Sequence, residues 1–136
     1  MDEHRVAVVM GGTSGIGLAT ARRLVAAGVR VVVAGRDAGK GERARSELGA
    51  LARYVQADVA KSAAVERVIA EAVGTWGRLD WAVNAAALSD LRPAPTAEIT
   101  EAEWDATLAA DLKGVWLSMK YQLAVMAPAG AGMPVK

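Results

Sequence analysis

The 136-residue sequence contains no cysteine and no phenylalanine, and it has a single histidine, His4. Without cysteine the chain forms no disulfide and offers neither a thiolate metal ligand nor a cysteine nucleophile. One histidine excludes a multi-histidine metal site, so no metal site is expected. A Ser-His-Asp triad would have to use this residue close to the N-terminus as its base.

An excess of charge of either sign is also missing. Sixteen Lys+Arg against 15 Asp+Glu give a net charge of +1, which excludes a nucleic-acid binder that depends on a strong basic field. No apolar run approaches the ~20 residues that span a bilayer, and residues 1–5 do not resemble a signal peptide. With 53% hydrophobic and 23% charged residues the chain is not intrinsically disordered. We expect a cytoplasmic globular protein with no membrane or nucleic-acid partner.

Short apolar runs with strand character alternate with segments of helical spacing. The expected strands are residues 6–10, 29–34, 53–57 and 79–84, and the expected helices are residues 16–27, 37–48, 65–76 and 100–126. Such alternation is typical of an α/β fold with a doubly wound parallel sheet, here with strand order 3-2-1-4. We predict one unit over residues 1–127 and an irregular tail over residues 128–136, rich in Ala, Gly and Pro.

A glycine-rich turn separates the first strand from the first helix. Gly11 lets the chain turn off the strand, Gly15 leaves room for a pyrophosphate beside the backbone, and Gly17 lets the helix pack closely. Unpaired N–H groups at the helix start favour an anion there, and Thr13 and Ser14 add hydroxyl donors. The turn therefore favours nucleotide binding, although an ordinary Gly-rich turn would share the pattern.

Four motifs in order and at normal spacing resemble the short-chain dehydrogenase/reductase family. They are Met10–Gly17 (with Met in the usual Thr position), Asp58-Val59, residues 79–87 and residues 111–116. The resemblance covers residues 5 to about 130 and implies a Rossmann-like fold with NAD(P)-dependent oxidoreductase chemistry. It implies these cofactor-binding residues: Gly11, Thr13, Ser14, Gly15, Ile16, Gly17, Arg36, Asp58, Val59 and Asn84.

Two of these residues carry more specific expectations. Asp58 matches the aspartate that bonds the adenine amino group in the family, although a carboxylate in a strand-end turn would fit the same position. Asn84 matches the first Asn of the family's N-N-A-G motif, near the cofactor ribose. Ala85 and Ala87 replace the second Asn and the Gly of that motif.

The end of the second strand bears on the choice of dinucleotide. An acidic residue there selects NAD by bonding both ribose hydroxyls, whereas a 2′-phosphate requires its absence and a nearby Arg. By family alignment Gly35 takes the position of the acid, and Arg36 follows. We predict NADP in preference to NAD. The alternative is a solvated Arg36, with Asp37 reaching the ribose.

The family's catalytic Ser and Tyr-x-x-x-Lys lie beyond its fifth strand, and nothing in this sequence matches them. Tyr54 falls in the third strand, and Tyr121 is followed four residues later by Val125. The position of the family's helix Asn holds Asp111, either as a substitute in the proton relay or as a solvated carboxylate.

The sequence therefore looks truncated after its fourth helix, and two hypotheses follow. The first is an NADP-preferring oxidoreductase present as its cofactor-binding half, with a small alcohol or carbonyl substrate only in a completed protein. The second is a non-catalytic dinucleotide-binding module or an inactive partner subunit.

The long helix over residues 100–126 carries large apolar residues on more than one face. Trp104, Leu108 and Met119 follow one stripe, which Leu112 and Trp116 widen. One stripe would be enough to cover the sheet, and in the family the equivalent helix packs on its counterpart in a neighbouring subunit. We therefore expect a homo-oligomer formed through this helix, together with the open edge of the fourth strand.

Overall fold

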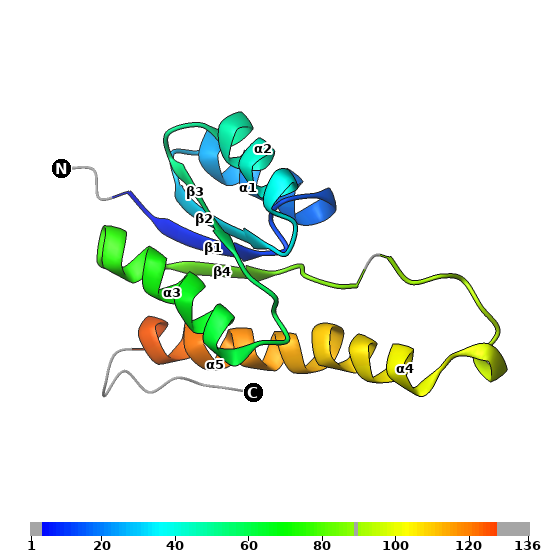
Figure 1. Ribbon diagram of the computed structural model, residues 1–136. Helices are drawn as coiled ribbons and strands as arrows, with labels where there is room; N and C mark the ends of the chain where they lie inside the picture. Colours follow the sequence, from blue (N-terminus) through cyan, green and yellow to red (C-terminus); the bar gives the residue numbers. More distant parts are fainter. Residues whose placement is uncertain (1–3, 89, 128–136) are drawn as a thin grey trace.

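A computed structural model describes residues 4–88 and 90–127 and has a parallel sheet of four strands (Figure 1). The strands are β1 (Val6–Met10), β2 (Arg30–Gly35), β3 (Ala52–Gln56) and β4 (Trp81–Asn84). Their order, β3-β2-β1-β4, confirms the predicted 3-2-1-4 sheet. The irregular tail expected over residues 128–136 lies outside the described residues.

Helices cover both faces of the sheet (Figure 1). On one face lie α1 (Gly15–Ala26) and α2 (Ala38–Leu48), and on the other lie α3 (Ser62–Trp76) and the last helix. That helix follows a 3₁₀ turn, η1 (Thr96–Glu98), and comprises α4 (Glu101–Thr107), the π-helical η2 (Leu108–Lys113) and α5 (Gly114–Met126). Within the described ranges no helix has both the length and the apolar character needed to cross a membrane.

The central strand β1 explains why the first apolar run is uninterrupted. All five of its residues are buried. Ala7 and Val9 pack in the layer of α1 and α2, while Val6, Val8 and Met10 pack in the layer of α3 and α5. A strand covered on both faces needs apolar side chains at every position, which removes the usual alternation.

The last helix turns its small side chains toward the sheet. Its buried residues are Ala110, Gly114, Leu117, Ser118 and Gln122. Leu117 and Gln122 are the larger residues on this face, whereas Trp104, Leu112 and Trp116 point outward and Leu112 is 66% exposed. At Gly114 an added Cβ would lie 2.7 Å from the Val59 side chain, so glycine allows the helix its close approach there.

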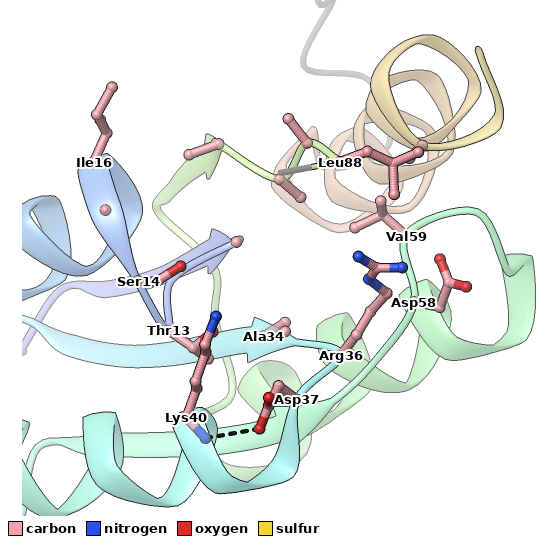
Figure 2. Close-up of a pocket in the computed structure, with 17 residues that line it drawn as sticks. Thr13, Ser14, Ile16, Ala34, Arg36, Asp37, Lys40, Asp58, Val59 and Leu88 are labelled. Carbon is pink, nitrogen blue, oxygen red and sulfur yellow. Dashed lines mark hydrogen bonds between the residues drawn. The ribbon is translucent and has the colours of Figure 1, made fainter. Parts of the chain in front are cut away.

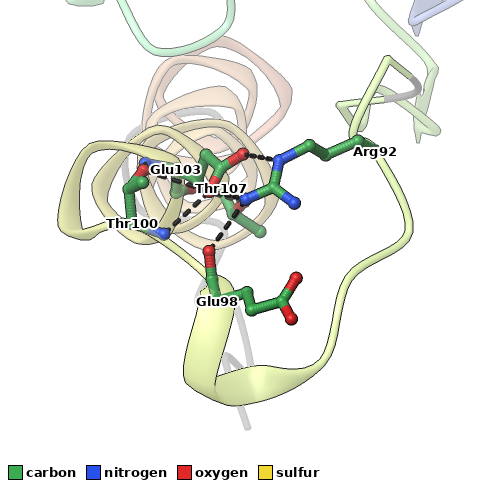
Figure 3. A network of polar contacts seen from close by, with 5 residues as sticks. All are labelled: Arg92, Glu98, Thr100, Glu103 and Thr107. Carbon is green, nitrogen blue, oxygen red and sulfur yellow. Dashed lines mark hydrogen bonds and ion pairs between the residues drawn. The ribbon is translucent and has the colours of Figure 1, made fainter.

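The segment between β4 and α4 is fixed to the start of α4 (Figure 3). Arg92 donates to the Glu103 carboxylate at 2.9 Å and to the Glu98 carbonyl at 2.8 Å. Thr100 and Glu103 form the capping box that their spacing predicts. Hydrogen bonds from the backbone and side chain of Thr100, followed by the one from Arg92, hold the pKa of Glu103 below its usual range.

Tyr54 joins β3 to the junction of β2 and α2. Its hydroxyl donates to the Gly35 carbonyl at 2.9 Å, and its ring lies against Gly41 on α2. Burial, followed by the charges of Asp37 and Glu42, raises the pKa of Tyr54. A Cβ at Gly41 would overlap the ring, whereas the exposed Gly74 on α3 has open space around it.

These two helical glycines give a matched pair of substitutions. Gly41→Ala should lower the free energy of unfolding by about 1–3 kcal/mol, because the methyl group forces the Tyr54 ring and α2 apart. Gly74→Ala should raise it by about 0.5–1 kcal/mol, because alanine has the better helix propensity and meets no neighbour. Urea denaturation of both variants measures the difference, and equal shifts in one direction would contradict the packing at Gly41.

Candidate functional site

A cleft of about 280 Å³ opens at the carboxyl ends of the strands (Figure 2). It lies where the chain leaves β1 toward β2 on one side and β4 on the other, the usual ligand crevice of a doubly wound sheet. Its lining residues are Gly11, Thr13, Ser14, Gly15, Ile16, Ala34, Gly35, Arg36, Asp37, Lys40, Asp58, Val59, Ala85, Ala86, Ala87, Leu88 and Ala110.

The turn after β1 is held by the neighbouring strands. The N–H groups of Gly11 and Gly12 both donate to the Ala34 carbonyl, at 2.9 and 3.1 Å. Gly11 has φ +75°, and a Cβ there would lie 2.6 Å from the Cα of Ala86. Gly17 does not line the cleft; it packs beneath it, where a Cβ would overlap the Gly11 carbonyl. This close approach brings the start of α1 to the cleft.

The N-terminus of α1 is open on the cleft side. Ser14 is the N-cap residue, but its side chain makes no capping hydrogen bond. Gly15 has φ +54°, and a Cβ added to it would have no neighbour within 4 Å, so the backbone is accessible there. Ile16 is 82% exposed. The uncapped first-turn N–H groups can bind an anion.

Thr13 fills the space beside the end of β2. A Cβ built on Gly35 would lie 2.5 Å from the Thr13 hydroxyl oxygen. An acidic side chain at position 35 would therefore have to displace Thr13. The two residues together leave this part of the cleft without a carboxylate.

The β2–α2 junction brings charged side chains to the cleft (Figure 2). The Arg36 side chain extends toward Val59, and Lys40 extends toward Thr13 and Ser14. Asp37 between them is the N-cap of α2 and accepts from the Lys40 N–H at 3.0 Å. This hydrogen bond holds the pKa of Asp37 below its usual range.

Lys40 was not among the residues predicted from the sequence. The available signal was the spacing: a residue three positions after an Asp N-cap lies in the first helical turn, at the same end as the cleft.

Asp58 and Val59 form the wall beyond β3. The Asp58 carboxylate accepts from the Ala60 N–H at 2.9 Å, as in the strand-end turn considered as the alternative, and both residues also line the cleft. Thus eight of the ten predicted cofactor-binding residues come together around one cavity.

Asn84, like Gly17, lies outside the lining. Its amide pairs reciprocally with that of Gln122 on α5: the Asn84 nitrogen donates at 3.0 Å and the Gln122 nitrogen donates back at 2.7 Å. Gln122 is only 2% exposed, so the pair satisfies two amides between the sheet and the helix.

Asp111 lies in the π-helical segment rather than in the cleft lining. Its carboxylate accepts from the Leu88 N–H at 2.9 Å, and Leu88 is part of the lining. Tyr121 also lies outside the lining, with its hydroxyl 2.6 Å from that of Ser62. Asp111 therefore contacts the cleft only through the backbone it holds.

A doubly wound sheet with a glycine-rich turn at its strand-end crevice defines the Rossmann-like class of α/β domains. Within that class, the chain belongs to the short-chain dehydrogenase family, whose model matches residues 5–135. This confirms the family resemblance stated from the motifs.

Similar proteins carry dehydrogenase or synthase names. Momilactone A synthase of Oryza sativa subsp. japonica is 40% identical over 129 residues, 94% of this chain and 47% of the rice protein. Cis-4-hydroxycyclohexanecarboxylate dehydrogenase of Sinomonas cyclohexanicum is 38% identical over 131 residues, 95% of this chain and 52% of that protein. The chain thus spans about half the length of these relatives.

Among solved structures, a crystal structure of a variant actinorhodin polyketide ketoreductase with NADPH superposes with a TM-score of 0.81. The sequence identity is 35%, and the match covers 88% of this chain and 46% of the ketoreductase.

Proposed function

We propose that the cleft binds NADP(H) and that the chain supplies the cofactor-binding half of an oxidoreductase of this family. The observation that carries the proposal is the end of β2, where Thr13 fills the place of an acid at Gly35 and Arg36 faces the cleft. The family membership and the NADPH in the ketoreductase structure support a nicotinamide dinucleotide.

The residues around the cleft suit the parts of such a cofactor. The open N-terminus of α1, with Ser14 and Gly15, would hold the pyrophosphate. Asp58 and Val59 would contact the adenine at the far wall. When bound, the nicotinamide gives or accepts a hydride.

A preference for the 2′-phosphate follows from the charges. Asp37 is the nearest acid after β2, but one of its oxygens is engaged at the α2 N-terminus. Arg36 and Lys40 both line the cleft and offer two cations to a dianionic phosphate. NADP is therefore favoured over NAD.

The second function, a non-catalytic dinucleotide binder or an inactive partner subunit, is favoured by the tyrosines. The hydroxyl of Tyr54 is bonded to Gly35 and that of Tyr121 to Ser62, and neither residue lines the cleft. Neither is followed four residues later by Lys. In both functions Asp111 is a positioning residue that holds Leu88 at the cleft wall.

We also propose that the last helix mediates homo-oligomer formation. Trp104, Leu112 and Trp116 are 60%, 66% and 54% exposed, and they form an apolar surface on the side away from the sheet. Leu108 and Trp116 border a shallow groove there. An exposed apolar surface of this kind marks an interaction site.

The cofactor assignment predicts the effect of Arg36→Asp. NADPH affinity should fall ~10- to 100-fold, because a charge-assisted contact becomes a repulsion, while NADH affinity changes less than ~3-fold. Calorimetry with NADPH and with NADH measures the change in each affinity. Arg45→Asp, the same charge change at an exposed position of α2 outside the cleft lining, should leave the NADPH preference intact. Equal weakening of NADPH and NADH would contradict the assignment.

The 136-residue chain alone should show no turnover of alcohols or carbonyls above background. The described part of the chain presents no tyrosine at the cleft to act as the general acid, a contribution commonly worth ~10²–10⁴ in rate. Absorbance at the NADPH band over a panel of small alcohols and ketones tests this. Turnover that disappears in Tyr121→Phe would show that this tyrosine acts as the acid.

The oligomer proposal predicts that Trp116→Glu produces a smaller species. Light scattering across a dilution series should show concentration-dependent association for the wild type and a monomer for the variant, because a charge there opposes burial of the apolar surface. Ala70→Glu, at an exposed position of α3, serves as the control and should associate like the wild type. A wild type that stays monomeric at all concentrations would refute the proposal.

A further inference from the structure

The cation assigned to the 2′-phosphate already has an anionic neighbour. A terminal nitrogen of Arg36 lies 3.6 Å from a carboxylate oxygen of Asp90. Arg36 follows β2 and lines the cleft, whereas Asp90 lies two residues beyond Leu88, the last residue of the opposite wall. We infer that Asp90 is a specificity-determining residue whose carboxylate competes with the 2′-phosphate of NADP(H) for Arg36. This inference rests on the proposed function.

Both partners are held in place by their surroundings. The Arg36 carbonyl accepts from the Gln56 side chain at 3.0 Å, which fixes the backbone from which the guanidinium extends. On the other side, Leu88 is bonded to Asp111 and Arg92 is bonded to Glu103. Asp90 thus lies two residues from each of two hydrogen-bonded residues, and its ion pair with Arg36 is long at 3.6 Å.

The ion pair is weak enough to be displaced. The side chains of Arg36 and Asp90 are 51% and 76% exposed, and exposed pairs are stabilised little because water and salt screen them. A phosphate carries about two negative charges and more acceptor oxygens than a carboxylate, so it is the stronger ligand for the guanidinium.

The competition acts on only one of the two cofactors. A 2′-phosphate must take Arg36 from Asp90 and then lies close to the displaced carboxylate, where like charges repel. NAD(H) has a neutral 2′-hydroxyl and needs no such exchange. Asp90 therefore lowers the affinity for 2′-phosphorylated ligands and narrows the difference between NADP(H) and NAD(H).

The test uses the intact chain, the variant Asp90→Asn and two probes, 2′,5′-ADP and 5′-AMP. Calorimetry at low salt should show that Asp90→Asn binds 2′,5′-ADP about 2- to 5-fold more tightly, the range of an exposed ion pair, and binds 5′-AMP as the wild type does. Glu98→Gln removes one negative charge from the same segment at a residue other than the ion-pair partner of Arg36, and it should leave both affinities unchanged.

A second experiment tests whether the effect of Asp90→Asn on 2′,5′-ADP binding depends on Arg36. In an Arg36→Gln background, Asp90→Asn should give a smaller gain for 2′,5′-ADP than it gives in the wild type, because only the direct repulsion between the carboxylate and the phosphate remains. An undiminished gain there, or one that Glu98→Gln reproduces, would overturn the competition for Arg36. A wild type that prefers 2′,5′-ADP while Asp90→Asn binds it no better would overturn the inference alone. A folded wild type with no preference for 2′,5′-ADP over 5′-AMP would overturn the proposed cofactor as well.

Discussion

The shape of the cleft depends on glycines at which a neighbouring element leaves no room for a Cβ atom. Gly17 packs against the Gly11 carbonyl and brings the start of α1 to the end of β1. Gly35 makes room for Thr13, and Gly114 lets the last helix reach Val59. Each of these contacts positions a different wall, so the lining residues come together only because the glycines allow neighbouring elements to touch. Because the packing is this close, a side chain added at one of these glycines would displace the residues that line the cleft.

Local pattern was sufficient for most of the fold. The run over residues 6–10 and its glycine-rich turn predicted β1 and the start of α1, and the spacing over residues 65–76 predicted α3. The last helix was expected to begin at residue 100, and α4 begins at Glu101 with Thr100 as its N-cap. These features depend on neighbours within a few residues, which a sequence displays directly.

Features made by distant residues could not be predicted in the same way. The sequence does not show that Asn84 pairs with Gln122, because that contact joins residues 38 positions apart. The face of the last helix that covers the sheet was obscured because several large apolar residues, Trp104, Leu112 and Trp116 among them, are exposed while Leu117 is buried. The π-helical turn around Asp111 has no recognised pattern, and the approach of Asp90 to Arg36 depends on how the segment after β4 is anchored.

The reciprocal amide pair between Asn84 and Gln122 and the ion pair between Arg36 and Asp90 respond differently to changes in pH and salt. Neither amide titrates or carries a net charge, so the contact between the sheet and the last helix is insensitive to acidity and ionic strength. The exposed ion pair between Arg36 and Asp90, in contrast, is weakened by salt. Changes in the electrolyte can therefore alter how the cleft discriminates between ligands while the framework beneath it keeps its geometry.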